Sequence, residues 1–197
     1  ISPTPVIGGI GLIQKLTKPM SHNFKKENSS IIVIGKTFGH LEQSVFFEEI
    51  HSILEGQPPE LNLNNEKNNG LCVLDIIKKD LVNAVHDISN GGLLTCLAEM
   101  SIQSNYGIKI NKPKKLTNLF AYYFGEDQSR YVLEVDKDNL SKVESLLKNN
   151  NIFYENIGST QKNYFEIEKE MKINIKDLYL INNQWYNKFN GITNRRN

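Results

Sequence analysis

A short segment that joins a predicted strand to a predicted helix, residues 83–93, has the composition of a phosphate-binding turn. Paired glycines let the backbone approach a ligand, and the free amide groups at a helix start attract an anion. A carboxylate before the glycines could hold magnesium. We predict a nucleotide or sugar-phosphate cleft, with Asp87 as metal ligand, at His86, Asp87, Ser89, Gly91 and Gly92. A simple tight turn with a structural histidine is the alternative.

Residues 124–130 form a second cluster, in which two acids, an amide, a hydroxyl and a guanidinium precede a predicted strand. Carboxylate oxygens there can bind magnesium, and the other groups can clamp a polar substrate. The residues predicted to face a ligand are Glu126, Gln128, Ser129 and Arg130. A solvated turn held by an arginine–carboxylate pair is the alternative. We expect this cluster and Asp87 to face a common hollow.

A third loop, residues 35–44, is bounded by glycines and lies between a predicted strand and a predicted helix. It resembles a phosphate loop only superficially, because Lys36 does not stand at the helix start as a Walker loop requires. We therefore predict a structural turn at this loop.

These motifs must be positioned by strands that alternate with amphipathic helices. Continuous apolar or β-branched runs predict strands at 31–35, 82–88, 107–110, 130–135, 152–157 and 164–167. Apolar stripes predict helices at 40–54, through 73–81, through 94–98, and from a cap at Asp138 to 147. The helix at 40–54 is expected to pack on the core. The alternation predicts an α/β (α+β) fold with a mixed sheet flanked by helices.

The chain divides into a connector and one domain. Residues 1–30 contain prolines, glycines and a polar run, which predicts a connector from a missing upstream ATP-associated domain, followed by an exposed loop. Residues 31–197 suffice for one core. The start at Ile1, without methionine, leads us to expect a piece of a longer polypeptide. Trp185 is expected to anchor packing, and Arg195–Arg196 to form a solvated tail.

The composition argues against several classes of protein. With 23 basic and 22 acidic residues, the formal net charge is +1, which offers no electrostatic case for nucleic acid or an anionic membrane as the main partner. The sequence has no apolar run near the ~18 residues of a membrane span. Cys72 and Cys96 lie among apolar residues of predicted helices, so we expect buried, reduced thiols and a cytoplasmic location.

Five ordered segments resemble the small, or subunit II, type of phosphoribosylformylglycinamidine synthase. They are 3–11, 39–44, Pro58–Leu61, His86–Gly92 and Phe124–Arg130. The similarity spans residues 1–135 and fades toward the carboxy terminus. It implies a fold like the carboxy-terminal domain of aminoimidazole ribonucleotide synthetase, with partial likeness to the ferredoxin arrangement. It also implies that the chain is the last domain of two duplicated halves.

The resemblance implies a role in de novo purine biosynthesis. The family converts formylglycinamide ribonucleotide, ammonia and ATP to formylglycinamidine ribonucleotide, ADP and phosphate, using ATP and Mg²⁺ to activate the formamide oxygen. A glutaminase subunit supplies the ammonia, and a small bridging subunit completes the complex. The main catalytic residues lie upstream of Ile1 in the family, so no catalytic residue is expected here and the fragment is expected to be inactive alone.

The resemblance also assigns roles to particular residues. Asp87 resembles the magnesium-binding acid of the first half, and Glu126–Gln128 resemble its substrate-contacting segment. Asn90 stands where the family usually has aspartate, which removes a charge beside the expected metal ligand. The cleft is therefore expected to be weakened or degenerate.

Two alternatives remain open at this stage. One is a structural and interaction domain that docks on the ATP-associated domains, which binding of magnesium-nucleotide or sugar phosphate by the fragment would contradict. The other is a related synthetase that makes aminoimidazole ribonucleotide, thiamine pyrophosphate or selenophosphate. The patterns Pro58–Leu61 and Gln128–Arg130 weigh against the second alternative.

Overall fold

The computed structural model describes residues 6–12, 19–113 and 118–191. Their helices and strands are, in chain order, β1 (Ser30–Ile34), α1 (Val45–His51), α2 (Leu63–Lys78), β2 (Ala84–Asp87), α3 (Gly92–Ile102), β3 (Tyr106–Ile110), α4 (Leu119–Phe124), β4 (Tyr131–Val135), α5 (Lys137–Asn149), β5 (Tyr154–Lys162), β6 (Tyr164–Ile167), β7 (Met171–Asn174) and α6 (Ile175–Phe189). None of these helices is long and apolar enough to cross a membrane.

The strands form one mixed sheet in the order β2-β4-β1-β5-β3-β6-β7. Neighbours are antiparallel except β3 and β6, which run parallel. All five residues of β1 are buried, as its continuous apolar run predicts for a central strand covered on both faces. The predicted α/β class with a mixed, helix-flanked sheet is confirmed.

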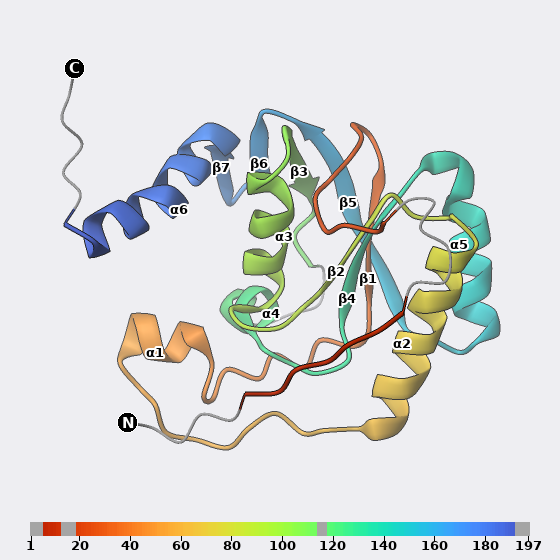
Figure 1. The fold of residues 1–197 in the computed structure, drawn as a ribbon, viewed down its shortest axis with the longest axis horizontal. Helices are drawn as coiled ribbons and strands as arrows, with labels where there is room; N and C mark the ends of the chain where they lie inside the picture. The colour runs from red at the N-terminus through yellow and green to blue at the C-terminus, as the bar shows by residue number, and fades with distance from the viewer. Residues whose placement is uncertain (1–5, 13–18, 114–117, 192–197) are drawn as a thin grey trace.

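Each face of the sheet carries its own hydrophobic core (Figure 1). Because side chains alternate along a strand, Ile31 and Val33 enter one core and Ile32 and Ile34 enter the other. Helices α3 and α4 cover the first face, and α2 and α5 cover the second. Cys96 of α3 and Cys72 of α2 are buried and free, as predicted, and burial raises the pKa of both thiols.

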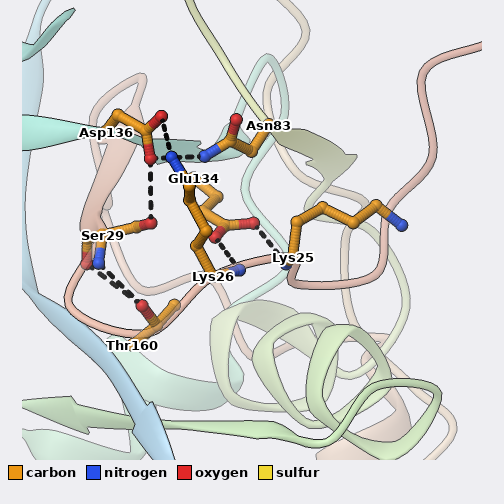
Figure 2. A network of polar contacts seen from close by, with 7 residues as sticks. All are labelled: Lys25, Lys26, Ser29, Asn83, Glu134, Asp136 and Thr160. Carbon is orange, nitrogen blue, oxygen red and sulfur yellow. Dashed lines mark hydrogen bonds and ion pairs between the residues drawn. The ribbon is translucent and has the colours of Figure 1, made fainter. Parts of the chain in front are cut away.

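The segment before β1 is part of the packed body, contrary to the exposed loop expected at residues 18–30. Phe24 is 2% exposed, and its N–H donates to the Met100 carbonyl of α3 at 3.2 Å. The fully buried Glu134 of β4 accepts the backbone N–H groups of Lys25 and Lys26 at 2.8 and 2.9 Å (Figure 2). One aromatic anchor and one carboxylate thus hold residues 21–29, which we call the strap.

A second set of polar contacts fastens the other end of the strap (Figure 2). Asp136 accepts Lys26 Nζ at 2.7 Å and Asn83 Nδ2 at 2.8 Å, while the Ser29 N–H donates to Thr160 Oγ1 at 2.9 Å. Partial burial acts to raise the pKa of Asp136, but the hydrogen bonds from Lys26 and Asn83 outweigh it and lower that pKa. The boundary at residue 30 stays a prediction, and so does a link from residues 6–12, which are exposed and carry no strand or helix, to an upstream domain.

The helix expected at 40–54 is shorter than predicted and does not pack on the core. Helix α1 begins after Ser44, whose hydroxyl accepts the N–H of Phe47, and ends at Ser52, whose φ of 55° is left-handed. None of the residues of Val45–His51 is buried. Periodicity correctly predicted a one-sided helix, but it did not predict what covers the apolar side.

Three further predictions need correction or extension. Trp185 does not anchor the packing, because it is 65% exposed and, within the described part of the chain, stacks on no ring but that of Phe189 in its own helix. The N-cap of α5 is Asp136 rather than Asp138, which lies in the first turn. The sequence prediction also missed α4, β7 and α6. Arg195 and Arg196 lie outside the described residues.

Candidate functional site

A buried carboxylate organises the loop after β1. Asp127 is 4% exposed, and its oxygens accept the backbone N–H groups of Phe38 at 2.9 Å, Gly39 at 2.8 Å and His40 at 3.2 Å. Gly39 has a φ of 82°, and a Cβ there would lie 2.8 Å from Ala121 Cβ. The loop therefore wraps around a side chain of its own chain, which agrees with the structural turn predicted for residues 35–44.

Arg130 supports the same cluster from inside. It is 1% exposed, and its guanidinium donates to the carbonyls of Gly125 and Asp127 and to Thr37 Oγ1. Burial lowers the pKa of the guanidinium, and the nearby Asp127 carboxylate, 4.0 Å from Nη1, opposes that effect. Such a closed set of contacts fixes the loop between α4 and β4. Contact of Arg130 with a ligand stays a prediction.

Glu126 joins the two motifs that the sequence singled out. Its Oε1 accepts the N–H of Gly91 and the N–H of Val45, each at 2.8 Å, and its own N–H donates to the His40 carbonyl at 2.9 Å. An acid at the start of α1 also suits the positive end of a helix. The turn before α3, the loop before α1 and the loop before β4 are therefore held together by one carboxylate.

Close packing explains the paired glycines before α3. Gly91 and Gly92 have φ of 77° and 71°, values that favour glycine. A Cβ on Gly92 would lie 2.6 Å from the Phe124 carbonyl carbon, so the backbone that approaches this glycine is that of α4. The tight-turn alternative accounts for both residues. Ser89 is exposed, and its carbonyl accepts the Gly92 N–H at 3.0 Å.

His86 lies among acidic side chains at the edge of the sheet. Its Nδ1 is 3.2 Å from Asp87 Oδ1, its Nε2 is 3.3 Å from Glu99 Oε2, and its ring centroid is 5.0 Å from that of His22. The Asp87 side chain is 65% exposed. Among the residues that the structure describes, no three His, Cys, Asp or Glu side chains are placed to hold a metal ion. Asp87 supplies one carboxylate, and a magnesium site would need donors from elsewhere.

A cavity of about 350 Å³ opens beside the second motif. Its lining includes Phe38, His40, Asn62, Asn65, Gln128 and Ser129. A neighbouring cavity of about 420 Å³ shares four of these residues, Phe38, Asn65, Gln128 and Ser129. Both volumes are in the range of small-molecule sites. The lining is rich in neutral amides, which both donate and accept hydrogen bonds.

Ser129 lines this cavity in a left-handed backbone conformation. Its φ of 62° is left-handed, and its carbonyl accepts Asn69 Nδ2 of α2 at 2.8 Å. Its hydroxyl is buried and, among the described residues, has no hydrogen-bond partner. A buried hydroxyl without a partner is unusual in a folded protein. Contact of this hydroxyl with a ligand stays a prediction.

The structure brings the two predicted motifs together, but this cavity is formed by only one of them. Gln128 and Ser129 line it, whereas Asp87 and Glu126 do not. A hollow shared by Asp87 and Glu126 therefore stays a prediction. Sequence reasoning missed Asn62 and Asn65, because the helix predicted through 73–81 begins at Leu63 in the structure. The usable signal was Asn62 itself, which caps α2 by accepting the Asn65 N–H at 3.0 Å.

Comparison with known proteins places this domain. The family described as AIR synthase related protein, C-terminal domain, matches residues 26–168. The chain belongs to this family. A phosphoribosylformylglycinamidine synthase subunit PurL from Pelagibacter ubique is 39% identical over 189 residues, which cover 96% of this chain and 26% of that protein. A PurL from Rhodopseudomonas palustris is 40% identical over 185 residues, 94% of this chain and 25% of the relative.

The chain thus spans about a quarter of the length of these curated relatives. Thermotoga maritima PurL complexed with FGAR superposes on this AIR synthase-type domain with a TM-score of 0.67 at 14% identity, covering 81% of this chain and 29% of that one. Thiamine-monophosphate kinase from Stenotrophomonas maltophilia superposes with a TM-score of 0.53 at 16% identity, covering 77% and 53%. These likenesses show the fold, and the resemblance inferred from the sequence is confirmed.

Proposed function

We propose that the chain contributes the C-terminal AIR synthase-type domain of an ATP-dependent phosphoribosylformylglycinamidine synthase in the cytoplasm. The reaction joins ammonia to formylglycinamide ribonucleotide and converts ATP to ADP and phosphate. The observation that carries the proposal is the 39% identity to a PurL subunit over 96% of this chain. The remaining domains, a glutaminase subunit and a bridging subunit would be its partners.

The part of the reaction that this domain serves is the binding and positioning of a polar substrate. Bound ATP would supply the phosphoryl group that activates the formamide oxygen. Gln128, Ser129, Asn62 and Asn65 offer neutral donors and acceptors around the cavity, which suit the hydroxyl and amide groups of a sugar-linked substrate. The Asp127–Arg130 cluster keeps these residues in place. Asp87 would contribute one oxygen to magnesium only together with donors outside the described residues.

A chimera tests the proposal. The matching segment of the Pelagibacter PurL is replaced by this chain, and formation of the amidine product from ammonia and ATP is measured. We expect an active chimera whose KM for the substrate rises on Gln128→Ala, whereas Gln103→Ala, at the far end of α3, leaves it unchanged. A chimera that is folded and soluble, but forms no product, would contradict the proposed function.

One observation favours the second candidate, a structural and interaction domain without a working ligand site. Glu126, Asp127 and Arg130 direct their polar groups to backbone groups of this chain's own loops. Calorimetry measures binding of magnesium-ATP or formylglycinamide ribonucleotide, each at about 1 mM, to the purified chain and so separates the two functions. Binding that weakens on Asp87→Ala or Ser129→Ala supports the ligand site, whereas absence of binding together with an active chimera supports the structural role.

A further inference from the structure

Asparagine is followed directly by glycine at three positions, Asn69, Asn90 and Asn190. In such a step the glycine nitrogen can attack the side-chain amide of the asparagine, because glycine has no side chain that shields its nitrogen. Asn69 is buried, whereas Asn90 and Asn190 are exposed. The surroundings of each step therefore set how readily its asparagine deamidates. This chemistry needs no ligand, so it is independent of the proposed function.

Deamidation exchanges a side-chain amide for an acid. The glycine N–H loses its proton, and the nitrogen then forms a bond to the asparagine Cγ. The Cγ–Nδ2 bond breaks, ammonia leaves, and a cyclic succinimide remains. Water opens this ring at either carbonyl and gives aspartate or isoaspartate, so that one water is consumed and one ammonia is released. A contact that keeps the glycine nitrogen protonated, or holds it away from Cγ, slows the reaction.

We propose that Asn90 is a deamidation site whose rate is controlled by Glu126. The Oε1 atom of Glu126 accepts the Gly91 N–H at 2.8 Å. A negative nitrogen is disfavoured beside this carboxylate, because like charges repel strongly at such a distance. The hydrogen bond must also open before the nitrogen can approach Cγ. Glu126 therefore keeps Asn90 in the amide form, although Asn90 is exposed.

The step at the end of α6 is held less firmly. The Gly191 N–H donates to the Lys188 carbonyl at 3.3 Å, which is a longer hydrogen bond to a neutral acceptor. Asn190 is exposed at the C-cap of the helix, and helix ends fray. We therefore expect Asn190 to deamidate faster than Asn90.

The step in α2 is held most firmly. Gly70 lies inside this helix, where the regular hydrogen bonds of the backbone engage its N–H. The amide of Asn69 is itself fixed, because its Nδ2 donates to the Ser129 carbonyl at 2.8 Å. We therefore expect Asn69 to deamidate more slowly than Asn90.

Deamidation of Asn90 would alter the turn that begins α3. Isoaspartate lengthens the main chain by one carbon, but the turn is closed by a hydrogen bond from the Gly92 N–H to the Ser89 carbonyl at 3.0 Å. It is also closely packed, since a Cβ on Gly92 would lie 2.6 Å from the Phe124 carbonyl carbon. Aspartate, the other product, would add a negative charge three residues after Asp87.

Timed incubation of the purified chain at mildly alkaline pH, followed by trypsin digestion and peptide mass spectrometry, measures the three rates. The three steps fall on different tryptic peptides, so each serves as a reference for the others. Glu126→Ala should raise the rate at Asn90 about tenfold and leave the rates at Asn69 and Asn190 unchanged. Glu126→Gln keeps a neutral acceptor and should give an intermediate rate. Glu48→Ala, which removes an exposed acid of α1, is the matched control and should change none of them.

Three results would overturn the proposal. The first is a rate at Asn90 in the wild type that equals the rate at Asn190. The second is an unchanged rate at Asn90 in the variants of Glu126. The third is a rise at Asn69 as large as that at Asn90, which would show general unfolding instead of local protection. Glu126→Gln provides the same comparison if Glu126→Ala does not fold.

Discussion

Removal of the Glu134 carboxylate should release the strap and destabilise the whole domain. Glu134 is fully buried in β4 and accepts the N–H groups of Lys25 and Lys26 (Figure 2). Hydrogen bonds to charged groups contribute ~1.5–3 kcal/mol each, and the desolvation of the carboxylate offsets part of that gain. We expect Glu134→Ala to lower the free energy of unfolding by about 3 kcal/mol. Glu134→Gln keeps one acceptor and should cost about 1–2 kcal/mol.

Urea unfolding measures these differences, and amide exchange locates them. In Glu134→Ala, the N–H groups of Lys25 and Lys26 should lose protection from exchange before those of β1 do. The reason is that the strap is held by side-chain contacts, whereas β1 is a central strand of the sheet. Glu27→Ala is the matched control, since the side chain of Glu27 lies on the same strap and makes a surface ion pair with Lys162. It should cost less than ~0.5 kcal/mol. Equal effects of the two alanine variants would refute the reasoning.

The same carboxylate predicts a pH dependence. Burial raises the pKa of Glu134 above its ordinary value of 4.5, and the two backbone N–H bonds offset this only in part. The folded state therefore holds the Glu134 proton more tightly than the unfolded state. The stabilisation that this protonation gives the folded state is complete below pH 4.5 and is lost as pH rises through the raised pKa. Wild type should lose stability relative to Glu134→Gln across that window. A constant difference in the free energy of unfolding would contradict this assignment.

Two further substitutions test the framework of the candidate site. Gly92→Ala should lower the free energy of unfolding by at least ~2 kcal/mol, because the added Cβ would clash with the backbone of α4 at a left-handed φ. Gly8→Ala is the control, since Gly8 has open space around it and its substitution should change stability little. Thermal unfolding compares the two variants. Asp127→Ala removes the acceptor of three backbone N–H groups and should cost ~3 kcal/mol, with exchange of the Gly39 amide rising first. Preserved exchange at Gly39 would show that the loop is held by other contacts.

Local sequence patterns predicted most of the sheet, because strands such as β1 and β4 are mainly apolar runs that the fold buries. The strap escaped prediction for a physical reason. Its residues 25–28 are exposed, and it is held by Phe24 and by backbone N–H groups that bind Glu134. A carboxylate in the middle of an apolar strand, between Leu133 and Val135, was the available signal. An acid that is fully buried needs donors, and here a segment 108 or more residues away supplies them.

The helix expected at 40–54 and Trp185 gave the opposite error, because both were predicted to pack on the core and both are more exposed than predicted. Both helices show the periodicity of a core helix, yet α1 buries none of Val45–His51, and Trp185 of α6 is exposed. Periodicity reports that one side of a helix avoids water, but it does not report which molecule covers that side. In α1, Phe46 stacks on Phe120 and Phe124 of α4, with ring centroids 5.5 and 4.9 Å apart, whereas Ile50 stays 65% exposed.

The acidic motifs of the candidate site illustrate why its residues were predictable and their roles were not. Glu126, Asp127 and Arg130 are the side chains that a ligand site would use, and the sequence places them next to one another. In the fold they instead form hydrogen bonds with backbone groups of three loops. Buried backbone groups need such partners in any chain with this topology. Ligand recognition by Gln128 and by the Ser129 hydroxyl, which has no hydrogen-bond partner among the described residues, stays a proposal. If that division holds, substitution at Asp127 will lower stability and binding together, whereas substitution at Gln128 will lower binding alone.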